Sequence, residues 1–370
     1  MKTELNIFLL LVGLFLVFYF MPMNSPLFTG AILSGFKFLN EYARQHVLTC
    51  LVPAFFIAGA ISVFVKKDFI LRYLSDQAKK YISYSLAAIS GSILAVCSCT
   101  ILPLFAAIRR RGAGLGPAIT FLFSGPAINI AAMFLTISVL GFKIGIARII
   151  SSISIAILVG LSMELIFREK TEAGGLFIKE DKEVDINKKI LVIFFAAMVG
   201  ILVVNGLQIN KIVKLSLIVL LALITLVIAI FKLPRETTKE WLTETWSFVK
   251  TLTPVLFIGV FVAGFMLPFL PENLIVKLVG SNSVLGNLVS AIFGAFMYFS
   301  TLTEIPILQA LIIKGMHSGP ALALLLSGPS LSLPNMLVIR KILGTSKTVV
   351  YVLLVILYST LAGLIFGSLI

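Results

Sequence analysis

The chain has 370 residues, of which 59% are hydrophobic and 12% are charged, and its mean hydropathy is +1.10. Soluble globular domains carry about 25% charged residues, so this composition excludes an ordinary soluble protein and indicates a multi-pass protein of the cell membrane. The net charge is +14, from 30 Lys and Arg against 16 Asp and Glu. Because the basic residues lie in short segments between apolar runs, they are typical of cytoplasmic loops beside anionic headgroups, and nucleic acid is not expected as a partner.

Three cysteines, at positions 50, 97 and 99, and two histidines give neither a disulfide framework nor a His-rich metal site. No cofactor is therefore expected. Residues 1–20 resemble a signal peptide, with one lysine before an apolar run, but no small-x-small cleavage site follows. We expect an uncleaved first helix.

A helix that crosses the bilayer needs about 20 apolar residues. In the first part of the chain, this length predicts spans at residues 6–21, 46–65, 82–108, 115–140 and 144–167. The third span is expected to break between residues 97 and 103, and the fourth at Gly125 and Pro126. Proline removes a backbone donor and glycine loosens the chain, which is why breaks are expected there.

The polar stretch 168–189 is expected to be the loop that joins two halves. Two plain spans follow, at residues 190–207 and 212–231. Residues 233–250 hold Trp241 and Trp246 among charged residues, which is typical of a helix lying at the membrane surface. The remaining spans are expected at residues 252–270, 285–313, 318–339 and 349–370.

The segment 95–129 has a second copy at 297–332. Seven of its glycine, proline and serine residues recur at one shared offset, so that Pro103 and Pro306 are 203 positions apart. The other six pairs are Gly112 and Gly315, Gly116 and Gly319, Pro117 and Pro320, Ser124 and Ser327, Gly125 and Gly328, and Pro126 and Pro329. An offset kept without a gap indicates an internal duplication.

The distribution of charge favours one arrangement of the two copies. If residues 82–108 and 285–313 each fold back as re-entrant segments, the main basic segments all fall on the cytoplasmic side; if each crosses once, that bias nearly vanishes. The basic segments are 66–80, 109–111, 168–189, 233–250 and 340–347. Re-entrant segments also make the two copies antiparallel, as in the inverted repeats of secondary transporters.

The expected fold is therefore an all-α, polytopic membrane protein of two duplicated halves, with broken or re-entrant helices at Gly-Pro motifs. An N-terminal helix and its connection occupy residues 1–45, and the first repeat occupies 46–167. A linker of polar loop, two helices and a surface segment is expected at 168–250, and the second repeat at 251–370.

The matched Gly125-Pro126 and Gly328-Pro329 breaks predict a shared substrate site near the middle of the membrane. Such breaks are tolerated only where they are buried in protein or line a wet cavity, and a half-helix N-terminus presents a positive dipole to a partly negative substrate. The polar side chains best placed to line the site are those of Asn129, Ser330, Ser332 and Asn335. In the alternative interpretation, each proline only kinks a helix whose neighbours satisfy the freed backbone groups.

Four motifs carry a resemblance to a known family: CSCTILP, FLFSGPAIN, TEIPILQALIIKG and LLLSGPSLSLPN. With them, the chain from the region of Cys50 to the C-terminus resembles the predicted permease family that includes the ArsP-like organoarsenical efflux permeases. In the arsenical exporters, membrane cysteines are thought to hold trivalent arsenic. The resemblance implies this role for Cys97 and Cys99, which match such a motif.

The residues themselves allow two interpretations of this cysteine pair. Cysteines at i and i+2 point to opposite sides of a helix but to the same side of an extended segment. Pro103 favours a non-helical CSCT in which both thiols face one cavity, where soft thiolates suit a thiophilic ion such as a trivalent arsenical. Alternatively, both cysteines only pack as small apolar residues, since Ser300 and Leu302 replace them in the second copy.

Glu304 is the only carboxylate in the middle of an apolar segment. A buried acid is costly in a membrane and usually functional. Its aligned partner in the first copy is Ile101, so the two copies are expected to supply sulfur and an ionisable carboxyl group to one place. We predict Glu304 as the proton-coupling residue, with a structural ion pair or an acid facing loop water as the alternatives.

Together these features predict a proton-coupled secondary active exporter of a small thiophilic or organic solute, such as a trivalent organoarsenical. The chain has no GxxxxGK[ST] motif, which excludes ATP hydrolysis, and no HExxH or GxSxG motif, which disfavours an intramembrane enzyme. A passive channel and a transporter of another small anion or metabolite are the alternatives. A small-molecule substrate and the lipid bilayer are the expected partners, and a homo-oligomer is left open.

Overall fold

The protein is all-α in the part of the chain that the computed structural model describes, where no β-strand occurs. The described residues are 12, 15, 19, 22, 25–64, 73–74, 78–93, 98–128, 130–168, 188–206, 210–269, 278–297 and 304–370. Most of the first expected span, 6–21, and nearly all of the expected polar loop, 168–189, therefore lie outside the described residues.

The helices of the first half and the linker are α2 (Pro26–Tyr42), a π-helical segment η1 (Ala43–Leu51), α3 (Val52–Phe64), α5 (Lys80–Ile93), α6 (Ser98–Arg110), α7 (Leu115–Ala127), α8 (Ile130–Leu140), α9 (Phe142–Ile166), α10 (Lys188–Gly206) and α11 (Lys211–Phe231). Those that follow are α12 (Arg235–Met266), a short 3₁₀ turn η2 (Leu267–Phe269), α14 (Val284–Phe296), α15 (Glu304–Ile313), α16 (Ser318–Leu331), α17 (Leu333–Leu343) and α18 (Thr345–Leu369).

Several of these helices are long and apolar enough to cross a membrane. They are α9, α11, α12 and α18, with 20 to 32 residues in their spanning ranges. Two further candidates are the pairs α7 with α8 and α16 with α17, and each pair is bent by 48° at a short break. The prediction of an all-α polytopic membrane protein is confirmed.

The two halves share their helix boundaries at the offset of 203 residues. The helix α8 begins at residue 130 and ends at residue 140, and α17 begins at 333 and ends at 343. The helix α9 spans 142–166, and α18 spans 345–369. Glycines with positive φ angles also lie at matched positions: Gly112 and Gly315 precede α7 and α16, and Gly141 and Gly344 precede α9 and α18. The spacing that the sequence shows in its punctuation therefore recurs in the secondary structure.

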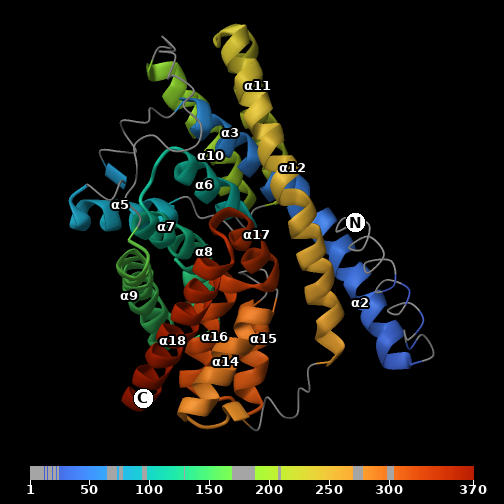
Figure 1. Ribbon diagram of the computed structural model, residues 1–370, viewed down its shortest axis with the longest axis vertical. Coiled ribbons are helices and arrows are strands. Elements are labelled where there is room, and N and C mark those ends of the chain that lie inside the picture. Colours follow the sequence, from blue (N-terminus) through green and yellow to red (C-terminus); the bar gives the residue numbers. More distant parts are fainter. Residues whose placement is uncertain are drawn as a thin grey trace.

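Each half packs a corresponding trio of helices. In the first half α7 contacts α5 and α9, and in the second half α16 contacts α14 and α18 (Figure 1). Matched glycines permit the closest approaches. A Cβ on Gly160 would lie 2.7 Å from the carbonyl oxygen of Gly116, and a Cβ on Gly363 would lie 2.7 Å from that of Gly319. Any larger side chain at these crossings would push the helices apart.

The segments expected to be re-entrant each contain two short helices. The helices α5 and α6 have 14 and 13 residues, and α14 and α15 have 13 and 10. At 1.5 Å per residue, the described parts are about 15 to 21 Å long. In the second segment α14 ends at Phe296, and the next residue, Met297, has an extended backbone, so this segment is broken. The residues between α5 and α6 lie outside the described residues, and the re-entrant course and inverted orientation of the halves stay predictions.

One helix replaces the expected surface segment and the span after it. The helix α12 runs without interruption over 32 residues, with Pro254 inside it, so the expected separation of a surface segment 233–250 from a span 252–270 is wrong, whereas the boundary of the second repeat at residue 251 stays a prediction. Proline removes a single hydrogen bond here, to the carbonyl of Lys250, and the helix accommodates the loss. Trp241 is buried, and its indole nitrogen donates to the carbonyl of Phe56 at 2.8 Å, so it anchors α12 to α3.

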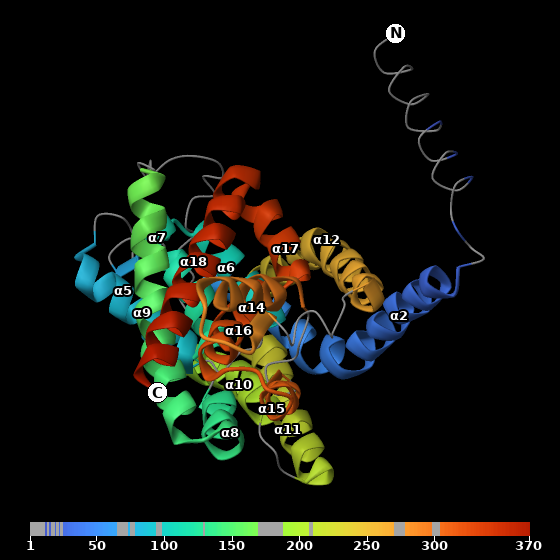
Figure 2. The ribbon, with the colours of Figure 1, turned by 90° about the horizontal axis from the view of Figure 1, so that it is seen from below.

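The N-terminal connection also contains a helix that was not expected. The helix α2 lies along α12, and both occupy the side of the molecule opposite α5 and α9 (Figures 1 and 2). Close packing is possible because Gly35 and Gly264 face each other: a Cβ on Gly264 would lie 3.1 Å from the Cα of Gly35. Residues 26–42 therefore belong to the helical body rather than to a connecting segment.

Candidate functional site

Two helices that end in a Ser-Gly-Pro motif form the centre of the molecule. Every residue of α7 is buried, as is every residue of α16 after Ser318, and the two helices contact each other. Irregular backbone within a membrane is tolerated where it is buried in protein or lines a wet cavity. The two motifs meet the first of these conditions, and the shared substrate site between the halves stays a prediction.

The helices α7 and α16 end shortly after their Gly-Pro pairs, and not at the pairs themselves as expected. Gly125 and Pro126 lie within the last turn of α7, and Gly328 and Pro329 lie within the last turn of α16. The φ angle of proline fits a helix, and its missing N–H frees only the carbonyl four residues earlier. Each helix consequently continues for one or two residues beyond its proline before it ends.

The second break contains the predicted site residues Ser330, Ser332 and Asn335, all of which are buried. Their side-chain oxygens Ser330 Oγ, Ser332 Oγ and Asn335 Oδ1 have no hydrogen-bond partner among the described residues. Ser332 also has a φ angle of 23°, in a region that favours glycine. Backbone strain and unpaired buried polar groups concentrate at functional sites. The three described residues of the predicted lining have these properties, and their role in binding stays a prediction.

The structure tests the cysteine motif only in part. Cys97 and Asn129 lie outside the described residues, and the side chain of Cys99 is not described. The helix α6 begins at Ser98 and includes Pro103, so the expected extended conformation is wrong for residues 98–100. Pro103 is the sixth residue of α6, where it removes a single hydrogen bond and does not end the helix. The described residues hold no group of three or more His, Cys, Asp or Glu side chains that could bind a metal ion.

Glu304 begins α15 in the second half and faces Arg148 of α9 in the first half. The two side chains are buried, at 1% and 0% exposure, and Arg148 Nη2 lies 3.9 Å from Glu304 Oε2. This distance allows electrostatic attraction but exceeds the length of a hydrogen bond. Neither carboxylate oxygen has a hydrogen-bond partner among the described residues. The ion pair is thus buried and only loosely bonded.

Thr136 of α8 holds the guanidinium group from its other side. Arg148 Nη1 donates to Thr136 Oγ1 at 2.8 Å, and that hydroxyl donates in turn to the carbonyl of Ala132 at 2.6 Å. Thr136 Oγ1 therefore has its proton committed to the backbone and offers a lone pair to the arginine. This fixes one nitrogen of Arg148 and leaves the side that faces Glu304 free of hydrogen bonds within the described chain.

The ion pair lies beside both helix breaks. A Cβ on Gly328 would lie 2.8 Å from Glu304 Oε1, so the carboxyl group touches the Ser-Gly-Pro motif of α16. One turn after Arg148, Ser152 Oγ donates to the carbonyl of Ala127, the last residue of α7, at 3.5 Å. A charge from each half is thus positioned next to the break of each central helix.

Sequence reasoning identified Glu304 but missed Arg148 and Thr136. Arg148 lies within the expected span 144–167, which otherwise carries a charged residue only near its end, at Glu164. An arginine inside an apolar span is itself a sign of a functional or paired charge, and this signal could have found it. Thr136 gave no such signal, since a threonine is common in membrane helices.

A second acid lies in a different environment. Glu164 of α9 accepts a hydrogen bond from the hydroxyl of Tyr84 and pairs with Lys80, whose Nζ lies 2.9 Å from Oε1. Tyr84 and Lys80 both belong to α5, so the cluster joins α5 to α9. Both carboxylate oxygens of Glu164 are bonded, which is typical of a structural interaction.

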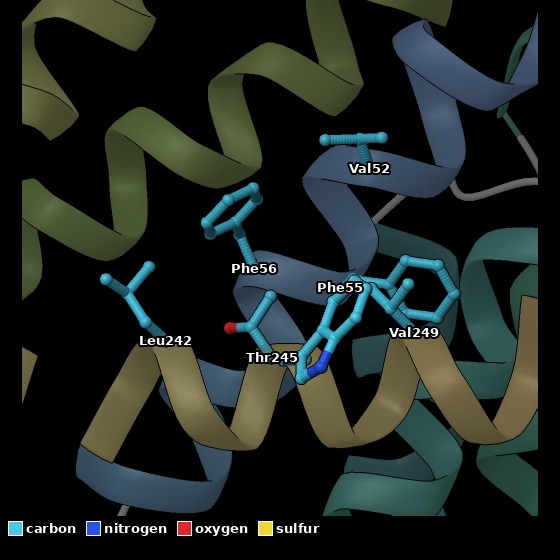
Figure 3. Close-up of a pocket in the computed structure, with 7 residues that line it drawn as sticks. Val52, Phe55, Phe56, Leu242, Thr245 and Val249 are labelled. Atoms are coloured by element: carbon cyan, nitrogen blue, oxygen red, sulfur yellow. The ribbon is translucent and has the colours of Figure 1, made fainter. Parts of the chain in front are cut away.

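A pocket of about 210 Å³ lies between α3 and α12 (Figure 3). Apart from the Thr245 hydroxyl, which donates to the carbonyl of Trp241, its lining is apolar or aromatic: Val52, Phe55, Phe56, Leu242, Trp246 and Val249. Apart from the indole N–H of Trp246, the lining offers no further side-chain polar group, so the pocket lacks the several convergent polar contacts of a ligand site. It does not compete with the Arg148–Glu304 region as a transport site.

Comparisons with known proteins agree with this architecture. The chain is 43% identical over 340 residues to the UPF0718 protein MJ0584 of Methanocaldococcus jannaschii, covering 88% of this chain and 93% of that protein. It is 22% identical over 305 residues to the UPF0718 protein YraQ of Escherichia coli, covering 81% of this chain and 72% of YraQ. No solved structure matches the chain. Residues 32–368 match the predicted permease family, and this multi-pass membrane protein therefore belongs to the predicted permease family.

Proposed function

We propose that this permease is a proton-coupled secondary transporter in which Glu304 takes up and releases the transported proton. One observation carries the proposal: a fully buried acid of the second half faces a buried arginine of the first half, beside the breaks of both central helices. Intramembrane ionisable residues that face the protein interior are typical of proton and substrate pathways.

Protonation of Glu304 would change the attraction between the two halves. The charged carboxylate attracts Arg148 across a buried, weakly screened environment. The neutral acid lacks that attraction. Protonation would therefore shift the equilibrium between conformations in which the two halves lie close together and conformations in which they lie apart. Coupling of a proton to a conformational change requires such a difference.

The gradient dependence of transport tests this proposal. In inverted membrane vesicles, the parent protein is expected to accelerate solute flux when a pH gradient is imposed, and Glu304→Gln is expected to lose this acceleration while still binding solute. A parent flux that ignores the gradient would instead indicate a passive channel. If Glu304→Gln responds to the gradient as the parent does, Glu304 is not the coupling residue.

We further propose a thiophilic cargo, such as a trivalent organoarsenical, exported from the cell. The support is the family resemblance together with the position of Cys97 and Cys99 in the sequence, four and two residues before Ile101, the residue equivalent to Glu304. A resistance screen with organic and inorganic arsenicals in an efflux-deficient host tests the cargo and its direction. Cys97→Ser and Cys99→Ser should each abolish resistance at normal expression; full resistance in the double variant would leave the cysteines as packing residues.

A further inference from the structure

The guanidinium group of Arg148 has an unused hydrogen-bonding edge. Its Nη1 donates to Thr136, whereas Nε and Nη2 have no hydrogen-bond partner among the described residues. These two nitrogens lie on the same edge of the planar group, and that edge is the one that binds a carboxylate with two parallel hydrogen bonds. Glu304 lies nearby but does not fill the edge, because Oε2 is 3.9 Å from Nη2.

Among the described residues, the helices that pack against α9 or α15 carry no other acid that could replace Glu304: α5, α7, α8, α16 and α18 contain neither Asp nor Glu. The helices α8 and α16, which pack against α15, contain no titratable side chain. On α9, Lys143 is exposed and Glu164 is bonded to Lys80 and Tyr84. When Glu304 takes up a proton, the positive charge of Arg148 therefore becomes uncompensated in a fully buried position, which is strongly unfavourable.

We propose that Arg148 binds an anionic group of the cargo, a carboxylate or another planar oxyanion, which takes the place of Glu304 when that residue is protonated. The proton goes to a carboxylate oxygen of Glu304 from the side to which the site is open, and the anion brings the opposing charge for Arg148. Proton and anion then bind together, and the site stays electrically neutral before and after loading. This inference rests on the proposed function for its proton step and is independent of the cysteines.

The contacts of Glu304 hold its carboxyl group only loosely. On the α16 side it lies against Gly328, whose missing side chain leaves the space that Glu304 Oε1 occupies. A purely structural ion pair would be expected to bond both oxygens, as Glu164 does with Tyr84 and Lys80. The loose geometry of the Arg148–Glu304 pair is what an exchange of partners requires.

Acetate binding to the purified full-length protein in detergent tests the proposal without any flux. Acetate is the carboxylate probe, and sodium chloride at equal ionic strength is the control. In the parent, one proton should bind to Glu304 with each acetate ion. In the pH range where unliganded Glu304 is charged, the acetate dissociation constant should therefore fall about tenfold for each pH unit by which the solution is acidified. Acetate addition should also remove protons from a weakly buffered solution.

Variants of the pair give a second, independent measurement. Glu304→Gln leaves Arg148 permanently uncompensated, so it should bind acetate equally well at about pH 6 and about pH 8, and acetate should raise its melting temperature. If this variant is too unstable to purify alone, it is purified in acetate, which is then removed. The double variant Arg148→Gln/Glu304→Gln should not bind acetate, and it should be stable enough to purify without acetate. Lys143→Gln removes an exposed positive charge from the same helix and should bind acetate as the parent does.

The results separate this inference from the proposed function. Acetate binding that is independent of pH in the parent, or that persists in the double variant, would overturn the assignment of Arg148. Failure of acetate to stabilise Glu304→Gln would do so as well. Gradient-independent flux combined with pH-dependent acetate binding would overturn proton-coupled transport and leave the anion site intact.

Discussion

Two acids of this permease, Glu164 and Glu304, differ in how completely they are bonded. Glu164 is 18% exposed, accepts the Tyr84 hydroxyl and pairs with Lys80 at 2.9 Å. Glu304 is 1% exposed, faces Arg148 at 3.9 Å and has no hydrogen bond among the described residues. The more deeply buried acid is thus the less satisfied one. Full bonding holds helices together, whereas incomplete bonding leaves a carboxyl group able to change its partner or its protonation state.

The duplicated scaffold places these charges at positions that are not equivalent. At the offset of 203 residues, Glu164 corresponds to Gly367, and Arg148 corresponds to Tyr351. In the second half, neutral amides take the place of the charged cluster: Asn287 Nδ2 donates to Asn282 Oδ1 at 2.9 Å, and Asn282 Nδ2 donates to the carbonyl of Leu364 at 3.1 Å. The two halves therefore share helices and crossings but contribute different chemistry.

Removal of Arg148 should have the largest effect. Arg148→Gln leaves Glu304 buried without its counter-charge, and we expect the free energy of unfolding at neutral pH to fall by about 3–5 kcal/mol. Lys80→Gln, in the partly exposed cluster, should cost about 0–1 kcal/mol. Thermal unfolding in detergent compares the two. Equal losses in both variants would show that the two ion pairs have the same role.

Gly328→Ala should have the next largest effect. The added Cβ would lie 2.8 Å from Glu304 Oε1, which forces the carboxyl group or α16 to move at a cost of about 1–3 kcal/mol. Gradient-driven flux should fall severalfold. Gly30→Ala, where a Cβ meets nothing within 4 Å, is the control. Parent-like flux in Gly328→Ala would mean that the carboxyl group does not need the space beside α16.

Thr136→Val should have the smallest effect of the three. It removes the acceptor of Arg148 Nη1 while keeping the shape of the side chain, and the lost hydrogen bond to a buried cation should cost about 1–2 kcal/mol of stability. Thr225→Val is a matched control, because the Thr225 hydroxyl donates only to the carbonyl of Leu221 on its own helix. Melting temperatures of the two variants in detergent measure the difference, and an equal loss would remove Thr136 from the site.

Hydropathy and the positions of glycine and proline were enough to predict the membrane class, most helices and the acid Glu304. These properties are local, and they are read directly from the sequence. The continuity of α12 was not predicted, because one proline removes only one hydrogen bond and packing against α3 and α2 stabilises the remainder. The helix α2 was missed because Lys37 and Glu41 reduce its apolar character.

The candidate site was predictable only in part for a different reason. Glu304 is unusual in its own segment, whereas its partner Arg148 lies 156 positions earlier, and only the folded arrangement of α9 and α15 brings the two together. Pro103 misled the prediction for residues 98–100, since a proline inside a helix removes one hydrogen bond without having to end the helix. The sequence therefore identifies unusual residues more readily than it identifies what they contact.

The protonation state of Glu304 during the transport cycle is the central claim, and infrared difference spectroscopy measures it directly. As the pH of the reconstituted parent protein is lowered, a carbonyl band of a protonated carboxylic acid should appear. The band should be absent in Glu304→Gln and present in Glu164→Gln, which removes the fully bonded acid. A band that persists in Glu304→Gln, or that disappears in Glu164→Gln, would contradict Glu304 as the site of the transported proton.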